Sequence, residues 1–560
     1  MLRTRVALAV LVCCALVLVG RAVQLQVFDH AFLSDEAEAR QLRVVQIAAN
    51  RGTITDRHGE PLAVSTPVDS VWVDPGDLIN APEFIPELAR LLAIDDEPLR
   101  ARLTRNAAKD FLYLRRHMNP QDAQRIMNAR IPGVHVQREY RRYYPAAQVT
   151  GHLVGFANVD EEGQEGIELA FDHRLRGQFG KKRVLKDRLG RMVEDIERIE
   201  APQPGQTVET SIDLRIQYLA FRELKKAVTQ QRAKSGTAVV VDIQTGEVLA
   251  MVNQPSYNPN DRAQFKPSRY RNRAITDIFE PGSSLKPLIM AAALESGKYK
   301  PDSLIDTSPG FLQVGVKKIS DPSNYGRIDL TTILARSSNV GASHIALALE
   351  PEHLWQVLSD FGLGKPTASG FPGESAGLLS HFDNWRSISQ ATLAYGYGLS
   401  VTPLQLAQAY AALGARGLQR PVSLVKQTQP PIPRRIIRPA TADAVLAMME
   451  DVVSPEGTGF RAAVPGYRVA GKTGTTQKYS RGGYSDERYA AIFAGVAPVS
   501  NPRLAVVVVI DEPNAGEYYG GVVAAPVFSR IVAGATRILA IPPDDLGVPR
   551  ESATTVALRR

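Results

Sequence analysis

The chain has 560 residues, of which 44% are hydrophobic and 22% charged, and its formal net charge is +8. This length exceeds one ordinary hydrophobic core, so two or three domains are expected. The positive charge is spread along the sequence, without blocks of like charge or a basic-aromatic pattern. A nucleic-acid partner is therefore not expected.

A transmembrane anchor is predicted at residues 6–25, after a cytoplasmic stub of residues 1–5. Residues 6–20 are apolar without interruption, and the run resumes after Arg21. About 20 such residues span a bilayer. Arg3 and Arg5 precede the run, so the positive-inside rule keeps the N-terminus in the cytoplasm and places the chain after about residue 30 outside. A cleaved signal peptide is the alternative, but no convincing small-x-small cleavage site follows.

The positions of the cysteines and histidines exclude some kinds of site from the part of the chain beyond the predicted anchor. Cys13 and Cys14 both fall inside the predicted anchor, so neither a disulfide framework nor a thiol nucleophile is expected beyond it. The nine histidines show no HExxH or comparable ligand spacing. We therefore expect no metal site and no cofactor.

Residues 40–205 are predicted to form a mixed α+β domain. A strand is expected at 43–49, an arginine-glycine turn at 51–57 and a polar helix at 120–129. The segment 201–205, Ala-Pro-Gln-Pro-Gly, ends this domain because its prolines and glycine break regular structure.

Residues 206–540 are predicted to form a second, α/β domain. A hairpin is expected from 236–242 and 247–253, since two β-rich runs flank a Gln-Thr-Gly turn. A mostly helical stretch, 283–417, follows. The remaining expectations are strands at 467–470, 489–496 and 504–511 and a closing helix at 524–539. Strands at both ends imply one antiparallel sheet covered by helices; residues 541–560 are predicted to be a disordered tail.

The first chemical motif is Ser283-Ser284-Leu285-Lys286, which we expect in the first turn of a helix. There the backbone N–H groups favour developing negative charge, and Lys286 lies one turn along the same face. A serine needs an adjacent base, and a lysine serves only where its pKa is lowered. An isolated tetrad more often combines a helix-capping serine with a surface lysine. A second tetrad, from Ser423 to Lys426, has no expected role.

The second motif, Ser337-Ser338-Asn339, lies in a polar break within helical sequence. Ser337 can relay a proton between lysines and a leaving group, while the Asn339 amide can hold Lys286 and a substrate amide. The alternative is a simple capping turn, a position that Ser and Asn favour.

The third motif is Lys472-Thr473-Gly474-Thr475, expected to follow an apolar strand. Gly474 lets a substrate backbone lie against an edge strand, and the two threonines offer hydroxyls to a carboxylate. The backbone N–H groups of Ser283 and Thr475 are the expected oxyanion hole. A phosphate-binding loop is excluded because Gly-x4-Gly-Lys is absent.

Together, in this order, the three motifs are those of penicillin-binding proteins and class A β-lactamases. The chain resembles a class B penicillin-binding protein of the septal, FtsI type, over nearly its whole length. Further matching segments are residues 51–63, 142–145, 152–156, 165–168, 245–251, 255–260, 271–273, 279–283, 395–398, 402–405, 518–521 and 525–528.

The resemblance implies a peptidoglycan D,D-transpeptidase that forms 4→3 cross-links between stem pentapeptides and is acylated by β-lactams. It implies an elongated pedestal of dimerisation type, then a transpeptidase domain with a five-stranded antiparallel sheet and an all-helical subdomain. The implied location is the bacterial inner membrane at the division septum, with the catalytic domain periplasmic. The implied partners are a SEDS-family septal glycosyltransferase and other divisome membrane proteins. The implied catalytic residues are Ser283, Lys286, Ser337, Asn339 and Lys472, and the implied substrate-binding residues are Thr473, Gly474, Thr475, Tyr395, Tyr518 and Tyr519.

Other classes fit less well. A β-lactamase needs a base for deacylation and lacks the pedestal, and a D,D-carboxypeptidase fits the chemistry but not the pedestal. A bifunctional synthase needs a glycosyltransferase domain, for which residues 40–205 are too short. A β-lactam sensor or division scaffold remains the non-catalytic alternative. Departures at Thr476 and Ser284-Leu285 remove no reacting group, but leave open whether the chain is the main septal enzyme or a paralogue.

Overall fold

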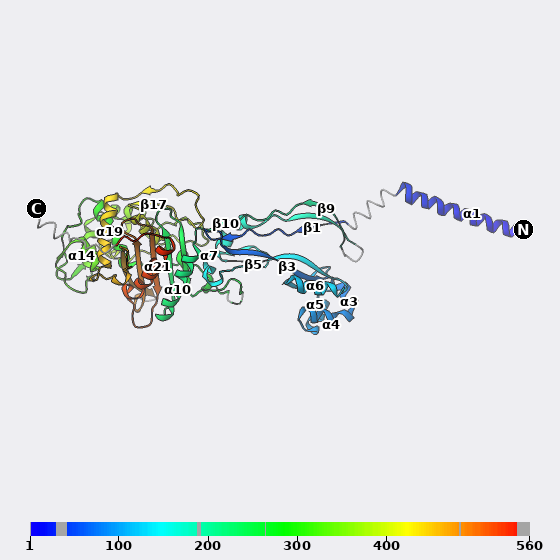
Figure 1. Ribbon diagram of the computed structural model, residues 1–560, viewed down its shortest axis with the longest axis horizontal. Helices are drawn as coiled ribbons and strands as arrows, with labels where there is room; N and C mark the ends of the chain where they lie inside the picture. Colours follow the sequence, from blue (N-terminus) through cyan, green and yellow to red (C-terminus); the bar gives the residue numbers. More distant parts are fainter. Residues whose placement is uncertain are drawn as a thin grey trace. The chain divides into compact units, whose positions relative to one another are not determined.

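The structure is a computed structural model that describes residues 2–29, 42–186, 192–261, 263, 265–480 and 483–545 (Figure 1). The chain divides into two compact units, each built from separate stretches. Unit 1 comprises residues 1–52, 65–142 and 176–206, and unit 2 comprises 53–64, 143–175 and 207–560. The predicted tail beyond residue 545 lies outside the described residues.

The N-terminal helix α1 spans Leu2–Val23 and continues as a π-helical turn, Gln24–Phe28. Its apolar span, Arg5–Phe28, is long enough to cross a membrane, and its apolar core is unburied. These properties are consistent with the predicted single-pass anchor. A second apolar stretch, Gly520–Ile538, is half buried within unit 2, which is typical of core helices in a soluble domain.

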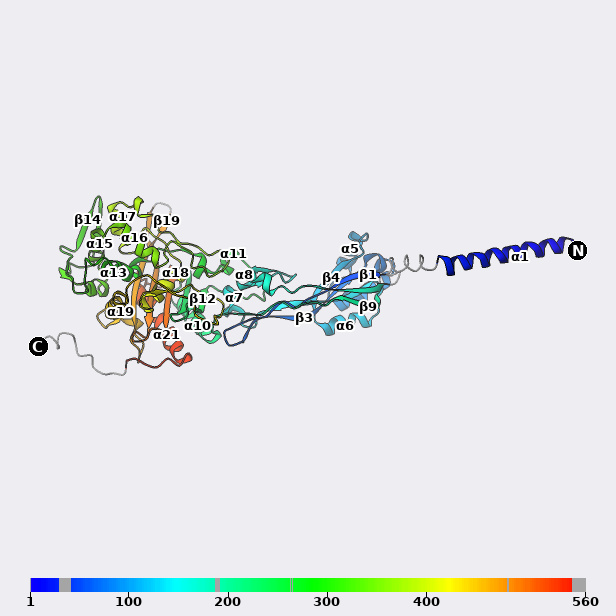
Figure 2. The same cartoon turned by 90° about the horizontal axis from the view of Figure 1, so that it is seen from above.

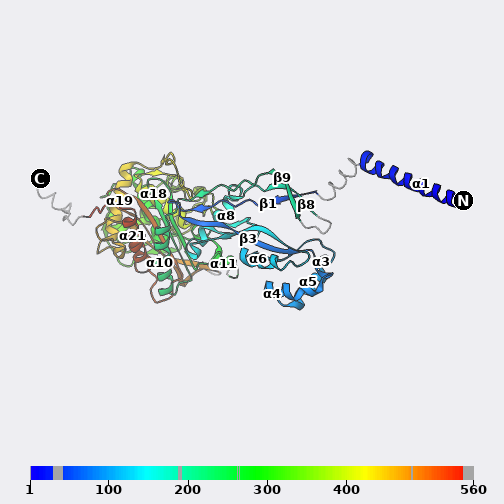
Figure 3. The ribbon, with the colours of Figure 1, turned by 45° about the vertical axis from the view of Figure 1, so that its right-hand side comes forward.

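Among the described residues, unit 1 contains two groups of strands and the short helices α3 to α6 (Figure 3). The predicted strand at 43–49 and helix at 120–129 are confirmed as β1 and α6. One antiparallel sheet has the order β1-β8-β9, and β3 pairs with both β4 and β5. The strands are β1 (Leu42–Ile47), β3 (Pro61–Val73), β4 (Leu112–Met118), β5 (Val134–Tyr143), β8 (Gly180–Lys186) and β9 (Met192–Glu200). The helices are α3 (Pro75–Ile79), α4 (Ile85–Leu92), α5 (Asp96–Arg105) and α6 (Pro120–Asn128).

Unit 2 is built on a five-stranded antiparallel sheet of order β12-β11-β21-β20-β19. Its strands are β11 (Ser235–Asp242), β12 (Val248–Gln254), β19 (Ala470–Ser480), β20 (Gly483–Ala497) and β21 (Leu504–Asp511). The predicted hairpin and the strands at 489–496 and 504–511 are confirmed.

The predicted strand at 467–470 is wrong in position, because β19 begins at Ala470 and contains the whole Lys472–Thr475 motif. Glycine and lysine are weak strand formers, so the pattern ended the strand too early. In the fold, Gly471 is required by packing: a Cβ there would lie 2.5 Å from the Phe493 ring.

Alternating side chains of the sheet enter two separate cores. On β21, Val506 and Val508 face α10 (Leu214–Gln230) and α21 (Ala525–Ile538), whereas Val507 packs in the core on the opposite face. Helix α18 (Pro403–Gly414) covers that opposite face. The sheet is therefore the middle layer of three, which explains why its strands are apolar on both faces.

Residues 283–417 are mostly helical, as predicted, but short strands interrupt them. Helix α13 (Lys286–Glu295) lies among the other helices and is buried from Lys286 to Leu294, so its apolar residues show no periodicity. Figure 2 shows α13, α15, α16 and α17 gathered into one helical group. The other elements are β13 (Ile305–Asp306), β14 (Phe311–Val314), β15 (Lys317–Ser320), β16 (Arg327–Ile328), α14 (Leu330–Ala335), α15 (Asn339–Ala348), α16 (Pro351–Asp360) and α17 (Ser387–Leu393), with α19 (Pro439–Val453) and α20 (Gly520–Val523) following later.

The core behind the sheet provides a stability test. Phe528 on α21 is fully buried, and its ring centroid lies 4.7 Å from that of Phe493. We expect Phe528→Ala to lower the free energy of unfolding by about 3–5 kcal/mol through lost contacts and the resulting cavity. Urea unfolding followed by circular dichroism measures the change. Phe460→Ala is the matched control, since that ring is 48% exposed; equal losses in both variants would contradict the prediction.

Candidate active site

Ser283 lies in a 3-10 turn, Gly282–Leu285, directly before α13 begins at Lys286. The sequence analysis predicted Ser283 in the first turn of the helix. In the structure it lies in a separate 3-10 turn that precedes the helix. Close packing explains this turn: Gly282 has φ of +56°, and a Cβ there would lie 2.4 Å from Thr476 Cγ2 on β19. The turn that carries Ser283 is therefore pressed against the edge strand, which only glycine at 282 permits.

Lys286 points into the interior and has no exposed surface. Its Nζ donates hydrogen bonds to the backbone oxygen of Ser337 (2.6 Å), to Asn339 Oδ1 (2.8 Å) and to Ser337 Oγ (3.3 Å). The first two sequence motifs thus meet at one amine.

Ser337 links this amine to the third motif. Lys472, also without exposed surface, donates from Nζ to Ser337 Oγ (3.0 Å) and to the backbone oxygen and Oγ1 of Thr473 (both 3.2 Å). Ser337 lies between α14 and α15 with φ of +58°, a left-handed conformation that is uncommon for a serine. Its hydroxyl is shared by both lysines.

Burial changes the protonation of the two lysines. It lowers the pKa of Lys472 to about 7. Burial and the nearby charge of Lys472 lower the pKa of Lys286 well below its ordinary value, against a smaller opposing effect of Asp321. A lysine with such a pKa can be neutral near pH 7 and accept a proton.

Asp321, which the sequence analysis missed, holds the second motif in place. Its carboxylate accepts hydrogen bonds from Ser338 Oγ (2.5 Å) and from the backbone N–H groups of Asn339 (2.5 Å) and Val340 (3.1 Å). A carboxylate at the start of α15 is also favoured by the helix dipole. Asp321 lies 17 residues before Ser338 in the sequence and belongs to no recognisable motif, so its role becomes visible only in the folded structure.

The third motif lies on β19, the edge strand of the sheet. Gly474 allows the chain before Ser283 to approach, since a Cβ there would lie 2.8 Å from Pro281 O. Thr475 Oγ1 accepts a hydrogen bond from Gly520 N (3.0 Å), and Thr473 Oγ1 lies 3.1 Å from Thr458 Oγ1. The turn of Ser283 and the strand of Thr475, the two expected oxyanion donors, are in contact.

The three tyrosines differ in exposure. Tyr519 is 55% exposed and directly precedes Gly520, which bonds to Thr475. Tyr518 stacks on Tyr489 with ring centroids 4.1 Å apart. Tyr395 is only 8% exposed, so most of its ring is packed in a small core.

The second Ser-x-x-Lys tetrad makes only structural contacts. Ser423 Oγ donates to Val425 O (2.6 Å), and the partly exposed Lys426 pairs with Glu209 at 2.5 Å. The lysine of this tetrad is not buried, and in the described part of the chain no hydroxyl there is shared between two lysines. Among the described residues, no group of three or more His, Cys, Asp or Glu is placed to hold a metal ion.

Comparison with known proteins identifies the family. Residues 236–533 match the penicillin-binding protein transpeptidase domain, and residues 46–210 match the penicillin-binding protein dimerisation domain. The chain is 46% identical to peptidoglycan D,D-transpeptidase FtsI of Escherichia coli (strain K12) over 535 residues, 94% of this chain and 90% of the relative. This chain belongs to the FtsI family of penicillin-binding proteins.

Other relatives agree with this assignment. The chain is 43% identical to a probable peptidoglycan D,D-transpeptidase, PbpC, of Pseudomonas aeruginosa, over 94% of this chain and 93% of the relative. The transpeptidase domain of Burkholderia pseudomallei penicillin-binding protein 3 superposes with a TM-score of 0.56 and 44% identity, covering 61% of this chain and 98% of that one. This FtsI-family member is a penicillin-binding peptidoglycan D,D-transpeptidase with the predicted fold.

The lowered pKa of Lys472 predicts a pH-dependent stability of this transpeptidase. The folded chain releases the Lys472 proton near pH 7, whereas an unfolded lysine holds it to about pH 10.4. Between these values the unfolded state binds more protons, so the free energy of unfolding rises with pH, by on the order of a few kcal/mol. In urea unfolding series, Lys472→Met should lose the Lys472 part of this rise and keep the part that comes from the lowered pKa of Lys286, and Lys426→Met should retain the whole rise. A rise that is the same in all three proteins would contradict the assignment.

We expect Asp321 to affect acylation by holding the second motif in position. Asp321→Asn should slow acylation by a fluorescent penicillin about 10- to 100-fold, because small displacements of a reacting constellation have effects of this size. Asp321→Glu should restore part of the rate, which a loss of folding would not allow. Asp302→Asn, at an exposed aspartate of the same subdomain, is the control and should react at the wild-type rate.

Proposed function

We propose that Ser283 is the nucleophile of this transpeptidase and that Lys286 is its general base. The hydrogen-bonded chain Lys286–Ser337–Lys472 carries this proposal, because it joins all three motifs and its first member directly follows the turn of Ser283. In the acylation step, neutral Lys286 takes the proton of Ser283 Oγ as the oxygen attacks the penultimate D-Ala carbonyl. The N–H groups of Ser283 and Thr475 stabilise the oxyanion.

The same proton network serves the leaving group. As the carbonyl–nitrogen bond breaks, Ser337 Oγ passes a proton to the amine of the departing D-Ala and is resupplied by the lysines on either side. Asn339 orients Lys286 and the substrate amide, and the hydroxyls of Thr473 and Thr475 bind the terminal carboxylate. The amine of a neighbouring stem peptide then attacks the acyl-enzyme, gives its proton to the network and frees Ser283 as the 4→3 cross-link forms.

We infer that the enzyme works at the septum, held in the inner membrane by α1 with its catalytic unit in the periplasm. The long unburied apolar helix and the similarity to FtsI relatives support this location. The inferred partners are a SEDS-family septal glycosyltransferase and other divisome membrane proteins, with stem pentapeptides as substrates and β-lactams as covalent inhibitors. Gly474 and the tyrosines at 395, 518 and 519 are inferred to shape the substrate groove.

Intact-mass spectrometry after incubation with penicillin tests the nucleophile. The wild type should gain one penicilloyl group, and Ser283→Ala should gain none. Lys286→Ala should be acylated slower by orders of magnitude, about 10²–10⁴-fold, as expected for loss of a general base. Ser423→Ala, in the tetrad of the same form, is the matched control and should label normally. Equal labelling of wild type and Ser283→Ala would refute the assignment.

A further inference from the structure

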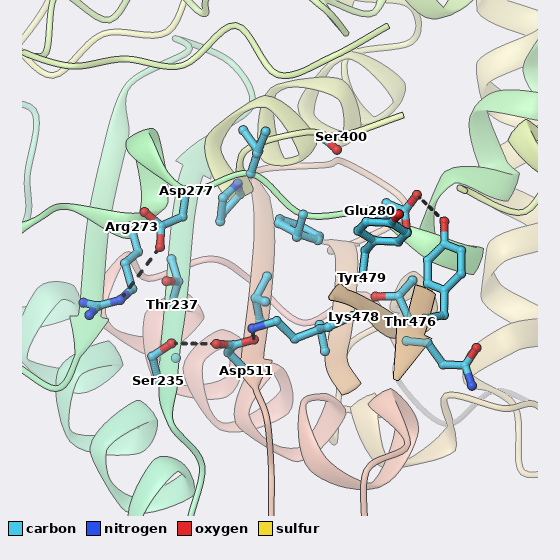
Figure 4. Close-up of a pocket in the computed structure, with 18 residues that line it drawn as sticks. Ser235, Thr237, Arg273, Asp277, Glu280, Ser400, Thr476, Lys478, Tyr479 and Asp511 are labelled. Carbon is cyan, nitrogen blue, oxygen red and sulfur yellow. Dashed lines mark hydrogen bonds and ion pairs between the residues drawn. The ribbon is translucent and has the colours of Figure 1, made fainter. Parts of the chain in front are cut away.

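A cavity of about 420 Å³ lies in unit 2 beneath the chain segment that leads into the turn of Ser283 (Figure 4). Its floor is formed by the ends of β11, β21 and β19, and its wall by Asp277–Glu280 together with Ser400 and Pro403. Ser283, Lys286 and Lys472 do not line it. Thr476 does, and its methyl group separates the cavity from Gly282. The cavity is therefore adjacent to the catalytic machinery but distinct from it.

Two of the three carboxylates that line the cavity are ion-paired. Asp511 pairs with Lys478 at 2.6 Å, and Asp277 pairs with Arg271 at 2.9 Å. Arg273, on the same wall, is 4.0 Å from Asp277. Figure 4 shows Lys478 beside Asp511 and Arg273 beside Asp277. Each of these two carboxylates therefore has at least one cationic partner.

Glu280 on the remaining wall is different. Its Oε1 accepts hydrogen bonds from Gly398 N and from the Tyr484 hydroxyl, both at 2.9 Å, and both donors are neutral. Within the described ranges of the chain, no lysine, arginine or histidine nitrogen lies within 4 Å of its carboxylate oxygens. Because both donors bind Oε1, Oε2 of this uncompensated carboxylate is left for a cation.

Aromatic side chains border the same carboxylate. Tyr479 and Tyr484 line the cavity, are 73% and 40% exposed, and pack edge to face with centroids 5.6 Å apart. A tyrosine face attracts an ammonium group within about 6 Å of its centroid. Phe279, Pro403 and Val509 supply apolar surface beside them.

We propose that this cavity is a second ligand site, which binds a small organic cation: a primary ammonium group on Glu280 with a compact apolar body against the tyrosines. Its volume lies within the range typical of small-molecule sites. The site touches the segment that carries Ser283, because Phe279 and Glu280 line the cavity and Glu280 is three residues before Ser283. Two backbone hydrogen bonds (3.0 and 2.9 Å) join Phe279, in the same segment, to Val401. An occupant therefore holds this segment in place.

Binding of 2-phenylethylamine to the full chain in nanodiscs tests the site by calorimetry, alongside 2-phenylethanol and phenylacetate. The three probes share a phenyl group and differ in charge. We expect the amine to bind about tenfold more tightly than the alcohol, as a charge-assisted hydrogen bond provides, and phenylacetate not to bind. Equal affinities for amine and alcohol, or no binding of the amine, would overturn the proposal.

Variants assign the binding to Glu280. Glu280→Gln keeps Oε1 as an acceptor for Gly398 and Tyr484 but removes the charge, and should bring the amine to the affinity of the alcohol. Glu352→Gln, at an exposed carboxylate on α16, should bind the amine as the wild type does. A loss of the same size in both variants would mean non-specific attraction and would also overturn the proposal.

Hydrogen–deuterium exchange locates the bound amine without relying on activity. Protection should appear in residues 277–282 and 476–479 of the wild type and vanish in Glu280→Gln. Protection confined to other segments would place the amine elsewhere and contradict the site. These readouts do not depend on Ser283 as the nucleophile, so penicillin labelling and amine binding can fail separately.

Discussion

Two lysine side chains without exposed surface share one serine hydroxyl, and this arrangement constrains the catalytic unit around it. Two ammonium ions cannot both be buried within hydrogen-bond reach of the same oxygen without a large loss of hydration energy. At least one amine must therefore be neutral near pH 7, which the lowered pKa values of Lys286 and Lys472 express. An amine that can accept a proton near pH 7 is in this way a consequence of packing.

Several features of the fold serve this constraint. Helix α13 is buried along almost its whole length, which keeps water from Lys286. Asp321 anchors the turn that presents Ser337 and supplies a negative charge that limits how far the pKa of Lys286 falls. Glycine at 282 and 474 leaves out the side chains that would otherwise separate the turn of Ser283 from the edge strand.

Much of this organisation could be predicted from the sequence, because the motifs are local and their residue types are dictated by chemistry. The hairpin at β11 and β12, the strand β21 and the helix α21 follow from apolar patterns that burial on both sides of the sheet preserves. The extent of β19 could not be predicted, since Gly471, Lys472 and Gly474 suppress the strand signal. The fold needs glycine at 471 and 474 because a side chain there would clash with neighbouring residues. Asp321 could not be predicted either, because its partners come together only in the folded chain. The contrast with Ser423 has the same origin: the two tetrads differ in burial, which no short pattern encodes.

The contact between Lys472 and Ser337 joins residues 135 apart in the sequence, so it exists only when the turn before α15 and the strand β19 are both in place. Before β19 adds to the sheet, Lys286 lacks the neighbouring charge and the complete burial that lower its pKa. An unfinished chain then carries an ordinary lysine and an ordinary serine. The lowered pKa of Lys286 is in this sense a property of the assembled domain and not of its own four-residue motif.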